Sequence, residues 1–500
     1  MRELLDDSAQ RTIQILELLS AQEGWTTFAD LSAAIGASER TVAEDVSKLR
    51  KRWGSNLKIE VSKKNGVRMQ NQSTASMAPV FRDLFNGSVA LLWIKELLFH
   101  PNETVEFYEN RLFASRSTLT RLLPKINRAL AGRGISIRCK NNRYQLLGRD
   151  EAYVRDFCAS FLLELFGLDP EACGLVADLS AVRELVLSAM KRTLAPNELT
   201  WMLRDDVALL YHMIFYMVSL MREGQGYTVP SDYPVEEEVP AGALESLQIR
   251  FPKLTLENLR AIHQHMYNRY RGWTSEVERE LIAREIETFL QRVFSAASIS
   301  PNQEKQDILC FALKSFYLNV KLRVVKTSAL YDRIFYFARA LRQSNPFLYR
   351  AVQENLELLS RKSGLDLVDR IGDCLFWMCL VCPELCRFAK PRTALLIDDF
   401  GTAHASFLAN FLSDIFCKIN SDQFHIEIAL YPNGAVSIPA ECCDVVITTI
   451  PNLPTTHPHV VLISDYPTYE NLCEIQKALF HEGPQPPQER AAAGEQRSRL

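Results

Sequence analysis

The stretch that decides the fold is LSAAIGASERTVAEDVSKL, residues 31–49. Leu31 and Ile35 are one helical turn apart and face inward, and Gly36 can take the left-handed conformation that ends a helix. Ser38 can cap a second helix, whose apolar residues then recur at spacings of four and three. This pattern predicts a helix-turn-helix in which the second helix meets a DNA groove. The inward face of this second helix would consist of Val42, Val46 and Leu49. The residues expected to face DNA are Ser38, Glu39, Arg40, Thr41, Glu44 and Lys48, and Asp45 is also placed outward.

Segments on both sides complete a winged unit. A helix is expected near Gln10–Ala21, because apolar residues line one of its faces. LKIEVSKKNGVRM, residues 57–69, indicates two short alternating strands joined at Lys64–Gly66, and the basic wing would place Lys63 and Lys64 on DNA. A small helical bundle without DNA contact is the alternative. The glycine, the cap, the apolar spacing and the wing together favour DNA binding.

The plan is repeated after a helix expected around Val89–Phe99. LFASRSTLTRLLPKI, residues 112–126, again has a serine cap and an inward face, Leu119, Leu122 and Ile126. Pro124 removes one backbone donor inside this helix and can kink it. ISIRCKNNRYQLLG, residues 135–148, is a second strand–turn–strand wing with its tip at Lys140–Asn142. The predicted DNA contacts are Ser115, Arg116, Ser117, Thr118, Arg121, Lys125, Lys140 and Arg143.

The distribution of charge supports this interpretation, although the net charge is only −3. From Arg111 to Asp150 there are ten basic residues and one acidic residue, and from Gly36 to Gln70 there are nine basic and four acidic residues. Compensating acids lie further on, for example at Glu236–Glu238. Basic N-terminal units on a nearly neutral chain are typical of a regulator that binds nucleic acid, with a salt-sensitive affinity.

Composition excludes several other classes of protein. A hydrophobic fraction of 47% and a charged fraction of 23% over 500 residues are those of a multidomain globular protein. The N-terminal sequence lacks the apolar segment of a secretory signal, and no apolar run is long enough to span a bilayer, so a cytoplasmic protein is expected. Its twelve cysteines would then be reduced thiols.

One cysteine cluster could announce a metal site: Cys374, Cys379, Cys382 and Cys386. However, a nearby histidine and a second CxxC pair are both lacking. The segment CLFWMCLVCPELC, residues 374–386, is also strongly apolar. A buried helix ending before Pro383 is therefore favoured, and we expect no metal and no other cofactor.

The middle of the chain has the periodicity of helices, and the end alternates strands with helices. His212 lies inside an apolar helix, where a lone histidine is ordinarily a core residue with one hydrogen bond. From about residue 391, TALLIDD, FHIEIALY, CDVVITTI and VVLIS indicate strands of a small α/β domain with a largely parallel sheet. The last residues have the composition of a disordered tail. The expected middle helices are 151–167, 179–193, 201–223, 255–270, 274–296, 303–325, 328–343, 346–363 and 366–380.

In this order of domains the chain resembles the Mga/AtxA family of Gram-positive regulators of virulence or carbohydrate-linked genes. The resemblance covers residues 1 to about 480 and is strongest in LSAAIGASERTVAEDVSKL, LFASRSTLTRLLPKI and ALLIDDFGTAHASF. It implies a mainly α multidomain fold, with middle domains similar to phosphotransferase-system (PTS) regulatory domains (PRDs) and a C-terminal α/β domain similar to EIIB, which aids dimerisation. The expected domains are winged helix-turn-helix units at 1–72 and 80–149, PRD-like domains at 150–298 and 299–390, an EIIB-like domain at 391–481 and a disordered tail at 482–500.

The resemblance also assigns candidate regulatory residues. His212 occupies the place of a phosphorylatable histidine in the first PRD-like domain, so a regulatory role stands beside the core role. His263 and His265 are expected on a helix surface, and no histidine lies between His265 and His404, which excludes a second phosphohistidine there. At the place of the phosphoryl-accepting cysteine of EIIB proteins, the chain has Asp398, three residues before Gly401. That departure implies a scaffold kept without its catalysis.

The resulting hypothesis is a DNA-binding transcription regulator, an activator and not an enzyme. Control would come from homodimerisation through the C-terminal domain and from PTS phosphorylation of His212. The expected partners are promoter DNA, a second copy of the chain, the general PTS phosphocarrier protein and RNA polymerase, and a membrane is not among them. One alternative is a phosphotransfer protein, disfavoured by the missing cysteine. Another is an RNA-binding antiterminator with the same regulatory domains, which would begin with a small β-rich domain.

Overall fold

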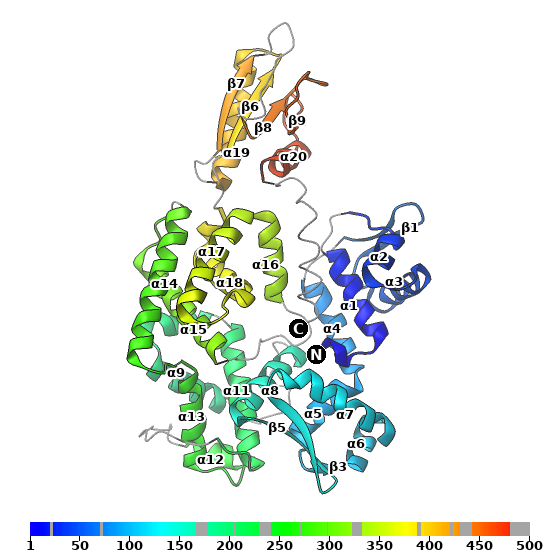
Figure 1. Cartoon of the computed structure of the whole chain (residues 1–500), viewed down its shortest axis with the longest axis vertical. Coiled ribbons are helices and arrows are strands. Elements are labelled where there is room, and N and C mark those ends of the chain that lie inside the picture. The colour runs from blue at the N-terminus through cyan, green and yellow to red at the C-terminus, as the bar shows by residue number, and fades with distance from the viewer. Residues whose placement is uncertain are drawn as a thin grey trace. The chain divides into compact units, whose positions relative to one another are not determined.

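The computed structural model describes the chain except for residues 21–23, 71–73, 167–178, 205, 230–241, 271, 298, 323–332, 388–391, 421–423, 431–442 and 481–500. The chain divides into two compact units (Figure 1). The first comprises Met1–Thr274 and Tyr317–Arg333, and the second Ser275–Phe316 and Ile334–Leu500. The tail predicted at 482–500 lies outside the described residues.

The first unit begins with a winged helix-turn-helix. Ile13, Leu16, Leu31, Val46 and Leu49 are buried and form the centre of its core. The wing is an antiparallel hairpin with Ile59 opposite Met69 and Ser62 opposite Gly66. Thr26, just before the second helix, forms a bridge with Val67 and so adds a third strand position to the wing. The elements are η1 (Arg2–Leu4), α1 (Asp7–Ser20), α2 (Phe28–Ile35), α3 (Glu39–Trp53), β1 (Ile59–Ser62) and β2 (Gly66–Met69).

A second winged unit follows with the same order of helices and strands. It is preceded by α4 (Thr74–Asn86), a helix that was not predicted and that contains Pro79. Met77, Val80, Phe81 and Phe85 nevertheless form a buried face at helical spacing. The sheet has the order β3-β5-β4. The remaining elements are α5 (Val89–Phe99), β3 (Glu103–Thr104), α6 (Val105–Leu112), α7 (Arg116–Ala131), β4 (Ile135–Lys140) and β5 (Arg143–Gly148).

The described remainder of the first unit is mainly helical. The helix predicted at 201–223 corresponds to α10, which ends at Arg204, and α11, which begins at Asp206; residue 205 between them lies outside the described residues. The short α12 was not predicted. Helix α11 packs against α8, α9 and α13, and therefore lies at the centre of this helical part. The helices are α8 (Glu151–Phe166), α9 (Leu179–Thr193), α10 (Pro196–Arg204), α11 (Asp206–Gly224), α12 (Ala243–Gln248) and α13 (Leu256–Tyr270).

The helices of the second unit include the cysteine segment. Helix α18 ends at Val381, directly before Cys382 and Pro383, which confirms the predicted end of this helix. Cys374, Cys379 and Cys382 are buried and Cys386 is exposed. Among the described helices, none is long and apolar enough to cross a membrane. The elements are α14 (Glu276–Ala296), α15 (Gln303–Lys321), α16 (Arg333–Ser344), α17 (Pro346–Ser363), η3 (Val368–Arg370), α18 (Ile371–Val381) and η4 (Pro383–Arg387).

The second unit ends in a small α/β fold. Its four described strands are all parallel, in the order β7-β6-β8-β9, which confirms the predicted largely parallel sheet. Leu396, Leu408, Leu412, Val445 and Ile475 are buried between the sheet and its helices. The elements are β6 (Arg392–Asp398), α19 (Thr402–Asn420), β7 (Phe424–Leu430), β8 (Val445–Thr448), β9 (Val460–Leu462) and α20 (Tyr469–Phe480).

Candidate nucleic-acid interface

Helix α3 has the start and the buried face that its sequence predicted. Gly36 ends α2 with a φ of 74°, and the Ser38 hydroxyl accepts a hydrogen bond from the Thr41 backbone N–H at 3.2 Å. Val42, Val46 and Leu49 are buried against the first two helices. The helix is therefore held by local capping and by one apolar stripe, which leaves its other face for a ligand.

The outward face of α3 is polar and largely exposed. Glu39, Arg40, Glu44 and Lys48 are exposed, whereas Thr41 is half-buried and its hydroxyl lies 2.8 Å from that of Ser38. The Arg40 side chain is 90% exposed and forms an ion pair with Glu44 at 3.1 Å. An exposed i,i+4 ion pair of this kind is weak, so a phosphate or a base edge could replace Glu44 as the partner of the Arg40 guanidinium.

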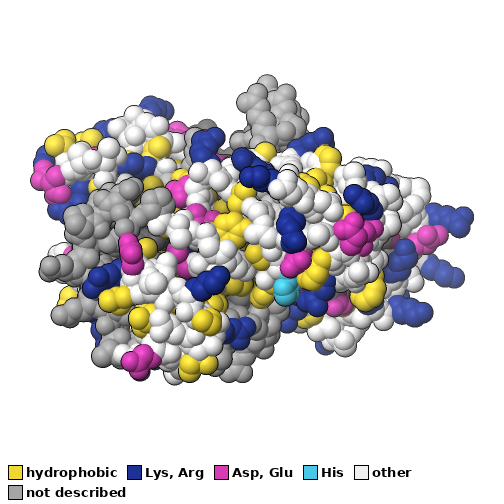
Figure 2. All heavy atoms as spheres, turned by 90° about the horizontal axis from the view of Figure 1, so that it is seen from below, with side chains coloured by type: hydrophobic (Ala, Val, Ile, Leu, Met, Phe, Trp, Pro, Cys, Tyr) yellow, Lys and Arg dark blue, Asp and Glu magenta, His cyan; other side chains and the backbone are white. Residues whose placement is uncertain are grey.

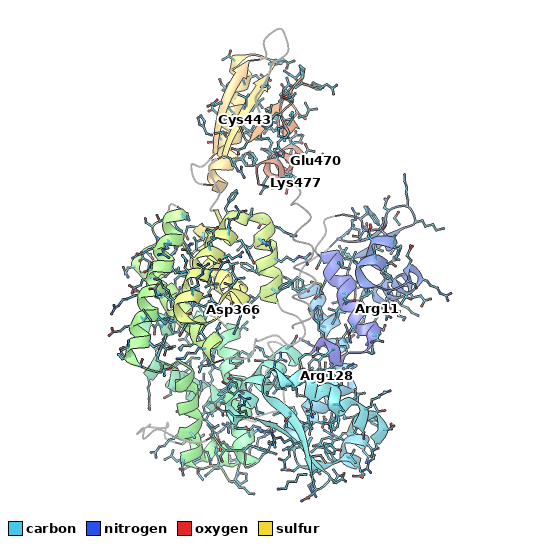
Figure 3. All side chains as sticks on the ribbon, in the orientation of Figure 1. Arg11, Arg128, Asp366, Cys443, Glu470 and Lys477 are labelled. Carbon is cyan, nitrogen blue, oxygen red and sulfur yellow. The ribbon has the colours of Figure 1, made fainter. Side chains whose placement is uncertain are left out.

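The prediction for Asp45 was wrong. Its side chain is 1% exposed and pairs with Arg11, whose Nε lies 2.8 Å from Asp45 Oδ2. Arg11 comes from α1, as its label in Figure 3 shows. Ser8 donates to the other carboxylate oxygen at 3.4 Å, and Lys48 Nζ lies 3.6 Å from that same oxygen. Asp45 therefore holds α3 on α1 and does not face DNA.

The first wing presents two adjacent lysines. Lys63 and Lys64 are exposed in the turn between β1 and β2, and the Ser62 hydroxyl accepts hydrogen bonds from the backbone N–H groups of Lys64 and Asn65. Gly66 has a φ of +95°, and a Cβ there would lie 2.2 Å from the Thr26 carbonyl oxygen. Glycine is thus required where the wing passes the start of α2.

Helix α7 repeats the arrangement of α3. The Ser115 hydroxyl accepts from the Thr118 backbone N–H, and Leu119, Ile126 and Leu130 are buried. Leu122, predicted to face inward, is half-buried. The helix continues through Pro124, which is exposed, and ends at Ala131. Of the predicted contacts on this helix, Arg116, Ser117 and Arg121 are exposed, and Thr118 and Lys125 are half-buried.

Arg116 has a nearby counter-charge. Its Nη1 lies 3.5 Å from Glu106 on α6, and both side chains are largely exposed. The pKa of Glu106 is lowered by hydrogen bonds from its own backbone N–H and from the Thr104 hydroxyl, and further by the charge of Arg116. The carboxylate thus stays ionised beside the start of α7, so Arg116, like Arg40, has an exposed acidic partner.

The second wing turns tightly at two asparagines. Asn141 and Asn142 have φ values of 53° and 60°, as a two-residue type I′ hairpin requires, and Lys140 pairs with Arg143 across them. Both basic side chains are exposed. The Arg143 guanidinium donates to the Asn102 carbonyl at 2.5 Å, which ties the wing to the segment before α6. The structure thus places two basic residues at each wing.

Exposed Lys and Arg side chains gather toward one edge of the surface in Figure 2. Sequence reasoning counted but did not assign the exposed Arg50, Lys51 and Lys58. They line a shallow hollow between the last turn of α3 and β1. Their charge and exposure suit contacts with the DNA backbone, which requires no particular base.

Two of the histidines considered in the sequence are buried. His212 is 6% exposed, and its Nδ1 lies 2.7 Å from the Ala208 carbonyl oxygen, as a core histidine with a hydrogen bond would be placed. His263 was predicted on a helix surface but is 1% exposed, because it lies one turn from Leu259 on the buried face of α13, against the Tyr216 ring. The side chain of His265 lies outside the described part of the chain.

At the end of β6, Asp398 has partners that sequence reasoning missed. Its carboxylate is buried and lies 3.0 Å from His404 Nδ1, and it accepts from the Thr449 hydroxyl at 2.8 Å. His404 Nε2 lies 2.9 Å from the Asp465 carbonyl oxygen. Both ring nitrogens of His404 therefore face acceptors, and the hydrogen bond to Asp398 raises the pKa of His404.

Two capped helices at the positions of recognition helices, each followed by a basic wing, define the class of winged helix-turn-helix DNA-binding proteins. Residues 73–162, which include the second winged unit, match the Mga helix-turn-helix domain. The resemblance to the Mga/AtxA family is thereby confirmed in this part of the chain.

Three curated proteins are similar over part of their length. A putative trans-acting regulator of Streptococcus pneumoniae is 25% identical over 166 residues, 33% of each chain. The capsule synthesis positive regulator AcpA of Bacillus anthracis is 22% identical over 136 residues, 27% of this chain and 28% of AcpA. AcpB of the same organism is 22% identical over 141 residues, 28% of this chain and 29% of AcpB. The similarity thus spans a third or less of these relatives.

Proposed function

We propose that the protein is a transcription regulator that binds promoter DNA with both winged units. The observation that carries this proposal is the duplicated geometry: α3 and α7 each begin at a serine cap, bury one apolar stripe and expose arginine just after the cap. Two of the similar proteins are named positive regulators, which supports activation. RNA polymerase would be the partner of an activator. The domain plan inferred from the sequence, with PRD-like and EIIB-like parts, belongs to the same proposal.

The test of DNA binding begins with mapping of bound DNA in the native cell, which supplies a specific fragment. Titration of this fragment at fixed salt then compares the full chain with Arg40→Ala and Arg116→Ala. Each substitution should weaken binding by about 1–3 kcal/mol if the arginine reads a base. Arg183→Ala is the matched control, because Arg183 is exposed on α9, outside both winged units. Unchanged affinity in both test variants, with folding intact, would contradict the assignment of these helices.

Homodimerisation through the C-terminal α/β fold is the second part of the proposal. This fold exposes neighbouring aromatic rings: Phe400 is 75%, Phe407 42% and Tyr466 65% exposed, and the rings of Phe407 and Tyr466 lie 6.3 Å apart. Large apolar side chains gathered on a surface favour a protein partner. Deletion from residue 391 onward should therefore shift the protein toward monomer in sedimentation. A Phe407→Ser, Tyr466→Ser double variant should do the same, whereas Ile249→Ser, at an exposed position of the first unit, should not.

Phosphorylation of His212 by the general PTS phosphocarrier protein is the third part. A carbonyl oxygen only accepts, so Nδ1 carries a hydrogen toward Ala208, and in the neutral ring Nε2 is the nucleophilic nitrogen. A phosphoryl group adds roughly −1.5 to −2 charges, which cannot stay buried unpaired, so α11 would have to move. His212→Asp and His212→Ala should then differ in promoter output. If both behave like the parent and no phosphohistidine forms with the general PTS proteins, His212 is a core residue only.

A further inference from the structure

Four charged side chains form a buried cluster where α8 meets the end of α11. Arg155 on α8 and Arg222 on α11 are both 0% exposed. Arg222 holds Glu151 in a bidentate pair, with Nε and Nη2 each 2.7 Å from a carboxylate oxygen. Arg155 Nη2 donates to Glu223 at 2.7 Å. Burial by itself lowers the pKa of Arg222, but the hydrogen bonds and charge of Glu151 outweigh it, so that this pKa is raised overall.

The same turn of α11 contacts the second winged unit. Arg222 Nη2 also donates to the Leu146 carbonyl on β5, at 3.3 Å. Three residues later, Gln225 Nε2 donates to the carbonyls of Leu98 and Phe99 at the end of α5, at 3.2 and 3.4 Å. The guanidinium of Arg222 lies over the ring of Tyr227, 3.8 Å from its centre. One end of α11 thus holds both a wing strand and the helix that packs against α7.

Stability alone is a poor reason for such a cluster. The cluster holds three ion pairs, because Arg155 Nε also lies 3.3 Å from Glu151. Buried ion pairs are costly to desolvate and stabilise a fold little more than apolar side chains of equal size. Arg155 and Arg222 each also retain a buried Nη1 for which the described atoms provide no hydrogen-bond partner. A bidentate guanidinium–carboxylate pair does fix orientation, because its two parallel hydrogen bonds form in one geometry only.

We propose that Arg222 is a positioning residue of the second wing (β4–β5). By holding Glu151 and the Leu146 carbonyl together, it fixes β5 on the end of α11, so that Lys140 and Arg143 reach DNA only while α11 keeps its place. His212 precedes Arg222 by ten residues on the same helix, about 15 Å at a rise of ~1.5 Å per residue, so a displacement caused at His212 reaches the wing through this contact. The inference rests on the proposed DNA binding.

The experiment uses the full chain with Arg222→Met, which removes the charge, and Arg222→Lys, which keeps the charge but cannot form the bidentate pair. Arg183→Met is the control for loss of an exposed arginine in the same unit. Hydrogen exchange is followed in peptides covering Ile135–Gly148 and, for comparison, α1–α3. The salt dependence of DNA binding is measured in parallel, since its slope reports the number of phosphates contacted.

Arg222→Met should speed exchange in β4–β5 by roughly 10- to 100-fold, the loss expected for hydrogen bonds to a charged group, and leave α1–α3 at the parent rate. The salt slope should fall by about 1–2, for the phosphate contacts of Lys140 and Arg143, without loss of all binding. Arg222→Lys should restore part of both effects, and Arg183→Met should change neither.

Parent-like exchange in β4–β5 of Arg222→Met would overturn the proposal, and so would faster exchange throughout the first unit. If Arg222→Met fails to fold, Arg222→Lys decides: faster exchange confined to β4–β5 supports the proposal, and parent-like exchange overturns it. A parent chain that does not bind DNA would instead refute the proposed function. The exchange rates, measured without DNA, would still decide whether Arg222 holds the wing.

Discussion

The Arg11–Asp45 pair predicts an asymmetric response to substitution. Arg11→Met would leave the Asp45 carboxylate, only 1% exposed, with the Ser8 hydroxyl and the more distant Lys48 ammonium as partners. Removal of one member of a buried ion pair lowers stability by about 3–5 kcal/mol. Because Lys48 still partly compensates the Asp45 charge, the loss expected for Arg11→Met is near the lower limit, about 3 kcal/mol. Asp45→Asn keeps an oxygen for Arg11, whose side chain is 25% exposed and can recover water, so its cost should be about 1 kcal/mol.

Hydrogen exchange of the α1 and α3 amides in the full chain measures this difference, because it reports local opening without requiring the whole chain to unfold in one step. A difference of about 2 kcal/mol corresponds to roughly thirtyfold faster exchange in Arg11→Met than in Asp45→Asn. Arg40→Met is the control on the same helix. Its pair with Glu44 is exposed, so exchange should change less than about threefold. Exchange in Asp45→Asn as fast as in Arg11→Met, or faster, would refute the argument that the buried carboxylate depends on Arg11.

Three further predictions concern separate features. In Gly66→Ala the new Cβ would lie 2.2 Å from the Thr26 carbonyl oxygen, so this variant should disrupt the Thr26–Val67 bridge. The expected loss of local stability is about 1–3 kcal/mol, measured as faster hydrogen exchange in β1–β2. Gly132→Ala, where a Cβ would meet open space, is the control. The hydrogen bond with Cys379 lowers the pKa of the exposed Cys386 thiol to about 7, so its alkylation by iodoacetamide should rise with pH through about 7, while the buried Cys374 stays unreacted. The pKa of His404 is raised above 6.5. Its contact with Asp398 should therefore stabilise the α/β fold fully below pH 6.5 and lose this effect as the pH rises through the pKa of the folded state. Hydrogen exchange in β6 and α19, corrected for intrinsic rates, should show this pH dependence in the parent and not in His404→Gln.

The features that the sequence predicted correctly are local. A cap bonds to a backbone N–H three residues later, and a buried stripe depends on neighbours one turn away, so Ser38 and Ser115 could be placed without knowledge of the rest of the chain. The bridge at Thr26 and the strand β3 were missed because one or two residues show no periodicity. Both lie before the helix that precedes the recognition helix, and both pair with the following wing.

Asp45 and His263 were misplaced for one shared physical reason. Asp45 lies three residues after Val42 and four before Leu49, and His263 lies four after Leu259, so helical geometry places both on buried faces. Their polarity suggested the opposite. A charged or polar residue is tolerated there because another element supplies a partner, Arg11 for Asp45 and Tyr216 beside His263, and such partners come from distant parts of the chain. Periodicity should therefore outweigh polarity where a side chain from another element can contact the buried polar group.

The same reasoning applies to the end of β6, where the sequence showed only an aspartate in place of a cysteine. Strands β6 and β8 are adjacent, so Asp398 and Thr449 meet at the carboxyl edge of the sheet, and α19 brings His404 to them. A phosphoryl acceptor needs a carboxylate oxygen that is free to attack. Here one oxygen accepts from Thr449 and the other faces His404, and the side chain is buried, so phosphorylation of Asp398 would have to break both contacts. These contacts favour a scaffold whose ion pair joins β6 and α19 over a phosphotransfer site, and they give Asp398 a structural role that its sequence position alone could not show.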